Sequence, residues 1–121
     1  MSNIKSDHFY LSCALALTIA LFLVGGQQWA GSVFIGQTHW IAHFFAYALI
    51  AIMYVKGLPR VAVFLIGVLV TGIGGLHEVY EISSHGHPFE FNDFLVNSLG
   101  AFTGALLTGV SASALQTMSK T

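Results

Sequence analysis

The sequence predicts an all-α fold, a bundle of four transmembrane helices that forms a single membrane domain over residues 1–121. Composition is the first observation behind this prediction: 55% of the residues are hydrophobic and only 7% are charged, whereas soluble domains carry about 25% charged residues. The second is the presence of four apolar stretches near the length of about 20 residues that a membrane helix needs. The third is that all four Lys and Arg residues lie outside those stretches.

The first two spans are expected at residues 9–24 and 39–55. Lys5 precedes the first span, so a cleaved signal peptide is an alternative interpretation of this stretch. No small-x-small cleavage site follows directly, because the polar pair after the closing glycines intervenes. We therefore expect a retained span. The second span ends where a Lys-Gly pair and Pro59 interrupt the apolar pattern.

The third and fourth spans are expected at residues 61–80 and 93–115. The third begins directly after Arg60 and contains no charged residue before Glu78. The fourth begins at an acidic residue, Asp93, and then stays apolar or small to its end. No repeat or linker divides the chain, so one domain is the only count that its length supports.

The cations predict the orientation of the bundle, because Lys and Arg are enriched in cytoplasmic loops. With four spans, the same side of the membrane receives every cation: Lys5, Lys56, Arg60 and Lys120. Both termini are therefore expected in the cytoplasm, and the loops at 27–38 and 83–92 are expected to face outward. The second of these loops carries His85, His87 and Glu90, which we expect to contact water.

Polar side chains gather near the outward ends of three predicted spans. Glu78 follows Arg60 by 18 residues, a helical rise of about 27 Å, close to a hydrocarbon thickness of about 30 Å. Polar groups at this depth face the bundle interior or a water-filled cavity, and helical spacing places partners i and i+4 on one face. The candidate polar site comprises His43, Tyr47, Glu78, Glu81, Asp93 and Asn97.

Small residues recur at helical spacing on the last two spans. Gly67, Thr71 and Gly75 form one stripe, and Gly100 and Gly104 form another. Such stripes let membrane helices approach closely. We expect the third and fourth spans to contact each other through them, which would join the carboxylates of the two spans.

Three kinds of chemistry are compatible with this polar site. One is a hydrogen-bonded cluster that only fixes helix register. Another is a metal site, in which His77, Glu81 and Asp93 supply nitrogen and oxygen ligands for zinc, iron or copper; no fixed-spacing metal motif is present, and no other cofactor is predicted. The last is acid–base chemistry by paired carboxylates. The sequence favours a non-enzymatic protein, because no activated nucleophile or phosphate loop is evident.

Three elements of the sequence resemble the VanZ-like family of small membrane proteins. The first is His43 followed four residues later by Tyr47, and the second is Glu78-x-x-Glu81, where the family usually has Gln at the last position. The third, which opens the last span, is Asp93-x-x-x-Asn-x-x-Gly-x-x-x-Gly. The order and spacing of the elements agree, and the resemblance covers residues 38–108.

The resemblance implies a bacterial cytoplasmic membrane location and a role in the cell envelope. The chain departs from the family pattern at two places, where His39-Trp40 replaces an Asp-Lys pair and where no arginine precedes Asp93 in the outer loop. Both departures remove a cation from the site. The resemblance implies no established reaction.

Three functional hypotheses follow. The first is a VanZ-like envelope protein that acts at the outer face on a lipid-linked or glycopeptide-type ligand. The second is a non-catalytic accessory subunit of a larger membrane complex, with other membrane subunits as partners beside the lipid bilayer. The third is a metal-binding membrane protein. A nucleic-acid partner is excluded, because the net charge is −1 and phosphate neutralisation requires an excess of Lys and Arg.

Overall fold

The computed structural model describes residues 3–86 and 88–120, and within them the fold is all-α. Four long helices are each long and apolar enough to cross a membrane. The predicted fold class is thereby confirmed, and the chain is a multi-pass integral membrane protein. A short helix lies between the first two long ones. The helices are α1 (Ile4–Gly25), α2 (Ala30–Val33), α3 (Gln37–Gly57), α4 (Val63–His85) and α5 (Phe91–Met118).

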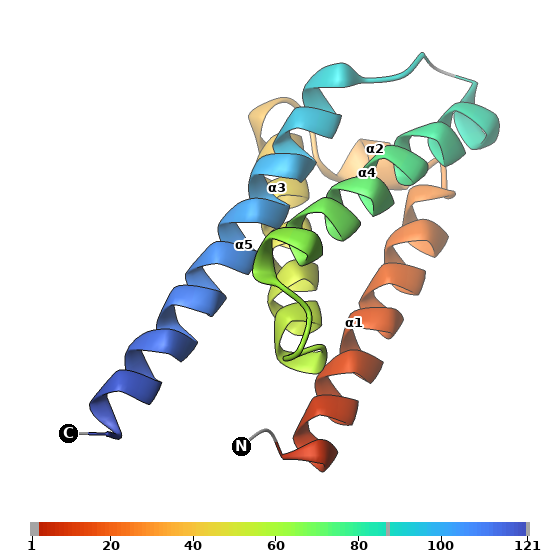
Figure 1. Cartoon of the computed structure of the whole chain (residues 1–121). Helices are drawn as coiled ribbons and strands as arrows, with labels where there is room; N and C mark the ends of the chain where they lie inside the picture. Colours follow the sequence, from red (N-terminus) through yellow and green to blue (C-terminus); the bar gives the residue numbers. More distant parts are fainter. Residues whose placement is uncertain (1–2, 87, 121) are drawn as a thin grey trace.

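The two ends of the bundle carry different elements (Figure 1). The start of α1 and the end of α5 lie at one end, whereas α2, the end of α4 and the start of α5 lie at the other. The Lys56 Nζ atom lies 4.9 Å from the centroid of the Tyr10 ring, so the C-terminal end of α3 meets the N-terminal part of α1. We call this end the terminal end, and the opposite end the acidic end.

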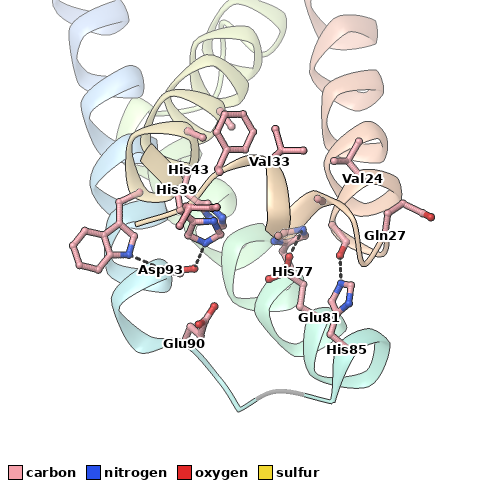
Figure 2. A pocket seen from close by; sticks show the side chains of 18 of the residues that line it. Val24, Gln27, Val33, His39, His43, His77, Glu81, His85, Glu90 and Asp93 are labelled. Carbon is pink, nitrogen blue, oxygen red and sulfur yellow. Dashed lines mark hydrogen bonds and ion pairs between the residues drawn. The ribbon is translucent and has the colours of Figure 1, made fainter. Parts of the chain in front are cut away.

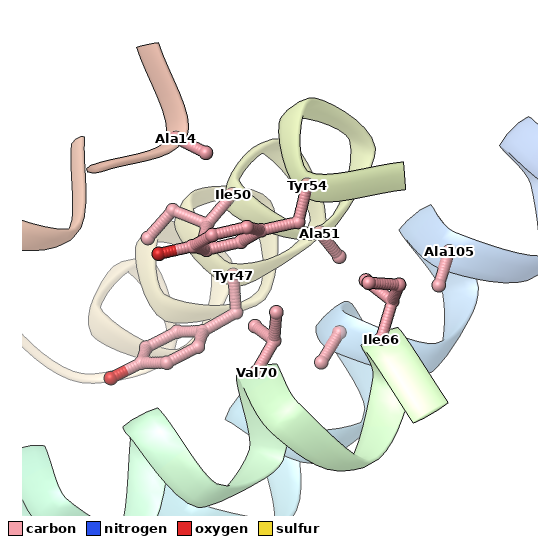
Figure 3. Packing of buried hydrophobic residues seen from close by; sticks show 9 residues of the cluster. Ala14, Tyr47, Ile50, Ala51, Tyr54, Ile66, Val70 and Ala105 are labelled. Carbon is pink, nitrogen blue, oxygen red and sulfur yellow. The ribbon is translucent and has the colours of Figure 1, made fainter. Parts of the chain in front are cut away.

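The core is small and centres on α3, which supplies four of its nine buried residues in the described part of the chain. Its buried members come from all four long helices: Ala14, Tyr47, Ile50, Ala51, Tyr54, Ile66, Val70, Ala101 and Ala105 (Figure 3). Many large apolar side chains lie on the outside instead, for example Phe64, Leu76 and Leu107, each more than 60% exposed. Such a surface suits contact with lipid tails, because apolar side chains need no burial in a hydrocarbon solvent.

Most helix ends lie beyond the predicted apolar spans, because hydropathy does not mark where backbone hydrogen bonding stops; the exception is the start of α4 at Val63, two residues after the predicted start at 61. α1 begins earlier, where the Asn3 side chain accepts a hydrogen bond from the Lys5 backbone N–H at 3.2 Å and caps the helix. α4 continues through polar residues to His85 and ends at Gly86, whose φ of 72° is left-handed. A glycine adopts this conformation without a Cβ clash.

The small residues pack differently from the prediction. The expected contact between α4 and α5 exists, but aromatic side chains of α5 fill the α4 stripe. A Cβ at Gly67 would meet the Phe102 ring, and one at Gly75 would lie 3.4 Å from Phe94. The Thr71 hydroxyl is buried on the same helix and has no hydrogen-bond partner among the described residues.

The GxxxG stripe of α5 faces α3, not α4. A Cβ at Gly100 would overlap the backbone carbonyl of Phe44, and one at Gly104 would overlap that of Ala48. The expectation that this stripe joins α5 to α4 was therefore wrong. A GxxxG pattern shows that some backbone approaches closely but does not identify the partner helix.

Candidate functional site

A cavity of about 1100 Å³ lies at the acidic end of the bundle (Figure 2). Its wall includes apolar side chains of the segment that links α1 to α3, such as Trp29, Val33 and Phe34. No lysine or arginine is among the described residues that line it. Its floor carries imidazoles and carboxylates from three helices: His39, His43, His77, Glu81 and Asp93.

Asp93 links α5 to two consecutive residues of α3. The Nε2–H of His39 donates to its Oδ2 at 2.6 Å, and the indole N–H of Trp40 donates to its Oδ1 at 2.9 Å. Asp93 is 3% exposed, so each carboxylate oxygen is engaged where water has little access. Charge-assisted hydrogen bonds of this kind are stronger than neutral ones.

One turn deeper, His43 and Asn97 form a second link between the same helices. The His43 Nδ1–H donates to Asn97 Oδ1 at 2.8 Å. Because Asn97 is fully buried, this hydrogen bond fixes the tautomer of the imidazole and leaves its Nε2 with a lone pair. The Asn97 side-chain amide nitrogen has no hydrogen-bond partner among the described residues.

The rings of His43, Tyr47 and His77 form a nearly equilateral triangle. The centroids lie 6.4 Å apart for the two histidines, 6.4 Å for His43 and Tyr47, and 6.5 Å for Tyr47 and His77. The Tyr47 hydroxyl is buried, and no described residue offers it a hydrogen bond. The triangle therefore brings α3 and α4 together through aromatic edges and faces.

His77 and Glu81 occupy one face of α4, as their spacing predicts. The His77 Nε2 lies 3.7 Å from a carboxylate oxygen of Glu81, and the His77 side chain is almost fully buried. The C-terminal end of α1 covers it, because a Cβ at Gly25 would overlap the His77 Nε2. Neither ring nitrogen forms a hydrogen bond with a described residue.

Glu78 is buried on the neighbouring face of α4, with 1% exposure. One carboxylate oxygen each from Glu78, Glu90 and Asp93 lie within 4.8 Å of one another. Within the described part of the chain, neither Glu78 oxygen meets a donor at hydrogen-bonding geometry. Glu90 is exposed and precedes α5, so the three carboxylates lie where α4 meets the start of α5.

His85 ties α4 to α1. It lies in the last turn of α4, and its Nε2–H donates to the Gly25 carbonyl oxygen at 2.6 Å. The expectation that His85 lies in a wet loop was therefore wrong, because the helix continues through the polar residues that were expected to end it. His87, assigned to the same loop, lies outside the described residues.

The structure brings most of the sequence-predicted residues to one end of the bundle but divides them. Asp93 and Asn97 of α5 are hydrogen-bonded to His39 and His43 of α3. Glu81 groups with His77 on α4, and Glu78 lies near both that pair and Asp93. The three metal ligands predicted from the sequence, His77, Glu81 and Asp93, are likewise not all together. His77 and Glu81 lie on α4, whereas Asp93 is bound by α3. Sequence reasoning missed the binding of Asp93 by His39 and Trp40.

No protein-family model, no curated protein and no solved structure matches this chain.

Proposed function

We propose that the chain is a VanZ-like protein of the bacterial cytoplasmic membrane that binds a lipid-linked or glycopeptide-type ligand in the cavity at its acidic end. The observation that carries this proposal is the composition of the cavity, which has an apolar wall at Val33 and Phe34 and a floor of imidazoles and carboxylates. Such a cavity suits a ligand with an apolar part and a polar part.

The convergence of the motif residues supports the family part of the proposal. His43 and Asn97, which come from two separate motif elements, share a hydrogen bond, and ligand atoms of His43 and Asp93 lie within 4.8 Å of each other. Gly100 and Gly104 permit the close approach of α3 and α5 that this meeting requires. The separate elements of the motif are thus explained by one arrangement, in which α3 and α5 pack closely and their polar residues meet.

The charges of the cavity indicate the polar part of the ligand. Its floor presents carboxylates such as Glu81 and Asp93 and no lysine or arginine among the described residues. The contacting group of the ligand is therefore rich in donors, such as amines, hydroxyls and amides, and is not a bare phosphate. Hydrogen bonds to ionised acceptors favour such groups.

The distribution of cations supports an outward orientation of the cavity. Lys5 and Lys56 belong to the terminal end of the bundle, and the positive-inside rule assigns that end to the cytoplasm. The ligand then enters from the outer face of the membrane. The proposed role of the site is binding, for which the imidazoles and carboxylates of the cavity floor supply the polar contacts.

The test is the identity of what co-purifies with the protein in a mild detergent, measured by native mass spectrometry. We expect a bound lipid-linked or glycopeptide-type molecule, which Ala42→Phe removes because Ala42 lines the cavity. Ala112→Phe is the matched control, since Ala112 lies on the exposed surface of α5. A stoichiometric protein partner instead of a small ligand would overturn the proposal in favour of an accessory subunit.

A further inference from the structure

We propose that His39, His43 and Asp93 form a binding site for a divalent transition metal ion, of which Zn²⁺ is the simplest representative, on the floor of the cavity. One ligand atom from each of these residues lies within 4.8 Å of the other two. The proposal rests on these donor atoms and their supports, and it is independent of the identity of any organic ligand.

The donor set is one that transition metals select. Two imidazole nitrogens with one carboxylate oxygen bind zinc, and the same set with open positions binds ferrous iron. Because the three residues line the cavity, a fourth coordination position opens into it and would hold water or a ligand donor. Hard cations such as Mg²⁺ and Ca²⁺ prefer oxygen ligands, so the two histidines favour the transition metals.

Two further residues already hold the donors in a metal-binding orientation. The hydrogen bond from His43 Nδ1 to Asn97 leaves the His43 Nε2 lone pair available, which is how metal-bound histidines are usually supported. The hydrogen bond from Trp40 to Asp93 Oδ1 leaves Oδ2 as the oxygen for the metal. Asn97 is fully buried, whereas Trp40 is 44% exposed, so the support of His43 is the more enclosed of the two.

Metal binding requires only a small rearrangement of His39. Its Nε2 now lies 2.6 Å from Asp93 Oδ2, whereas two donors of a tetrahedral zinc site are about 3.3 Å apart. The metal would take the place of the proton that the two atoms share, and binding would release that proton. The His39 side chain is 31% exposed, so it can rotate outward without disturbing the core.

The neighbouring group on α4 lacks comparable support. His77, Glu78 and Glu81 also bring three ligand atoms together, and all three come from one helix. However, neither nitrogen of His77 and neither oxygen of Glu78 has a hydrogen-bond partner among the described residues. His77 and Glu78 therefore lack the side-chain supports that orient metal ligands. The α3–α5 group is therefore the better site.

The experiment is a metal titration of the full chain, purified in detergent and stripped with a chelator. We expect one equivalent of Zn²⁺ to bind by calorimetry, and one equivalent of Co²⁺ to give the visible absorption of a low-coordinate site. His39→Ala is expected to weaken Zn²⁺ binding by more than the factor of about 10 to 100 that loss of a supporting residue causes. Asn97→Ala removes a supporting residue, so it is expected to weaken Zn²⁺ binding by a factor of about 10 to 100.

His8→Ala is the matched control, because His8 is exposed near the start of α1, at the opposite end of the bundle. It should retain the full affinity. Each variant is first checked for helical circular dichroism and a single size-exclusion peak. If Asn97→Ala does not fold, the Zn²⁺ affinity of His39→Ala tests the site by itself, because His39 is partly exposed and its loss should not prevent folding.

Two results would overturn the site. One is the absence of Zn²⁺ binding to the folded wild-type chain. The other is binding that His77→Ala abolishes while His39→Ala leaves it unchanged, which would move the metal to α4. Co-purification of the organic ligand is measured separately on chelator-treated protein, so loss of the metal site and failure of the proposed ligand function are distinguishable.

Discussion

His39 and Asp93 share a 2.6 Å hydrogen bond that joins α3 to α5 although the two residues are 54 positions apart in the sequence. The indole of Trp40 binds the other oxygen of the same carboxylate. Two consecutive residues of one helix therefore hold a single side chain of another, and they hold it on the floor of the cavity.

Trp40→Phe is expected to lower the stability of the bundle by about 1 kcal/mol, the scale of a side-chain hydrogen bond between membrane helices. The variant keeps an aromatic ring and loses only the N–H that binds Asp93. Thermal unfolding in detergent measures the effect. Trp29→Phe is the control, because the Trp29 side chain is 57% exposed; an equal loss in both variants would refute the role of the indole N–H.

Gly104→Ala is expected to destabilise the chain by about 1–3 kcal/mol, the range for overpacking a tight contact. The added Cβ would overlap the Ala48 carbonyl and push α3 away from α5. Gly72→Ala provides the comparison, since a Cβ there meets nothing within 4 Å and alanine is favoured over glycine in a helix by about 1 kcal/mol. Denaturant unfolding should rank Gly72→Ala above the wild type and Gly104→Ala below it.

Glu78→Gln is expected to raise the free energy of unfolding by about 1 kcal/mol, the net value of one hydrogen bond. The buried carboxylate meets no donor at hydrogen-bonding geometry among the described residues, while the carboxylates of Glu90 and Asp93 lie nearby. A glutamine removes the charge and offers an N–H₂ to those oxygens. A less stable variant would show that the carboxylate itself is needed for folding.

Cysteine labelling is expected to show the acidic end outside the cell. In a Cys13→Ala background, a cysteine at Gln28 should react with a membrane-impermeant maleimide on intact cells. A cysteine at Ser119 should react only after lysis, because it follows α5 at the terminal end. Both parent residues are exposed. The reverse pattern would overturn the orientation that the cations predict.

The fold class could be predicted because a membrane helix is defined by a long run of apolar residues, and the chain contains four. The helix ends could not be predicted equally well. They depend on caps such as Asn3 and on the left-handed conformation of Gly86, which hydropathy does not register. α4 consequently reaches His85, five residues beyond the predicted end of the third span at residue 80.

The depth of the polar residues was accessible from the sequence, but their pairing was not. Counting helical rise places Glu78, His39 and Asp93 near one level, and the structure has them at one end of the bundle. Which carboxylate meets which imidazole depends on the rotation of each helix, and that is decided by packing. Gly100 and Gly104 face α3. The same rotation of α5 places Asp93 and Asn97 within hydrogen-bonding distance of the histidines of α3.

The close contacts between α3 and α5 also determine which parts of the protein can move. Asp93 is held by two residues of α3, and the glycines of α5 are seated on the carbonyls of Phe44 and Ala48. Sliding either helix by one turn, about 5.4 Å, would break all of these contacts at once. The pair of helices therefore resists sliding of one helix along the other.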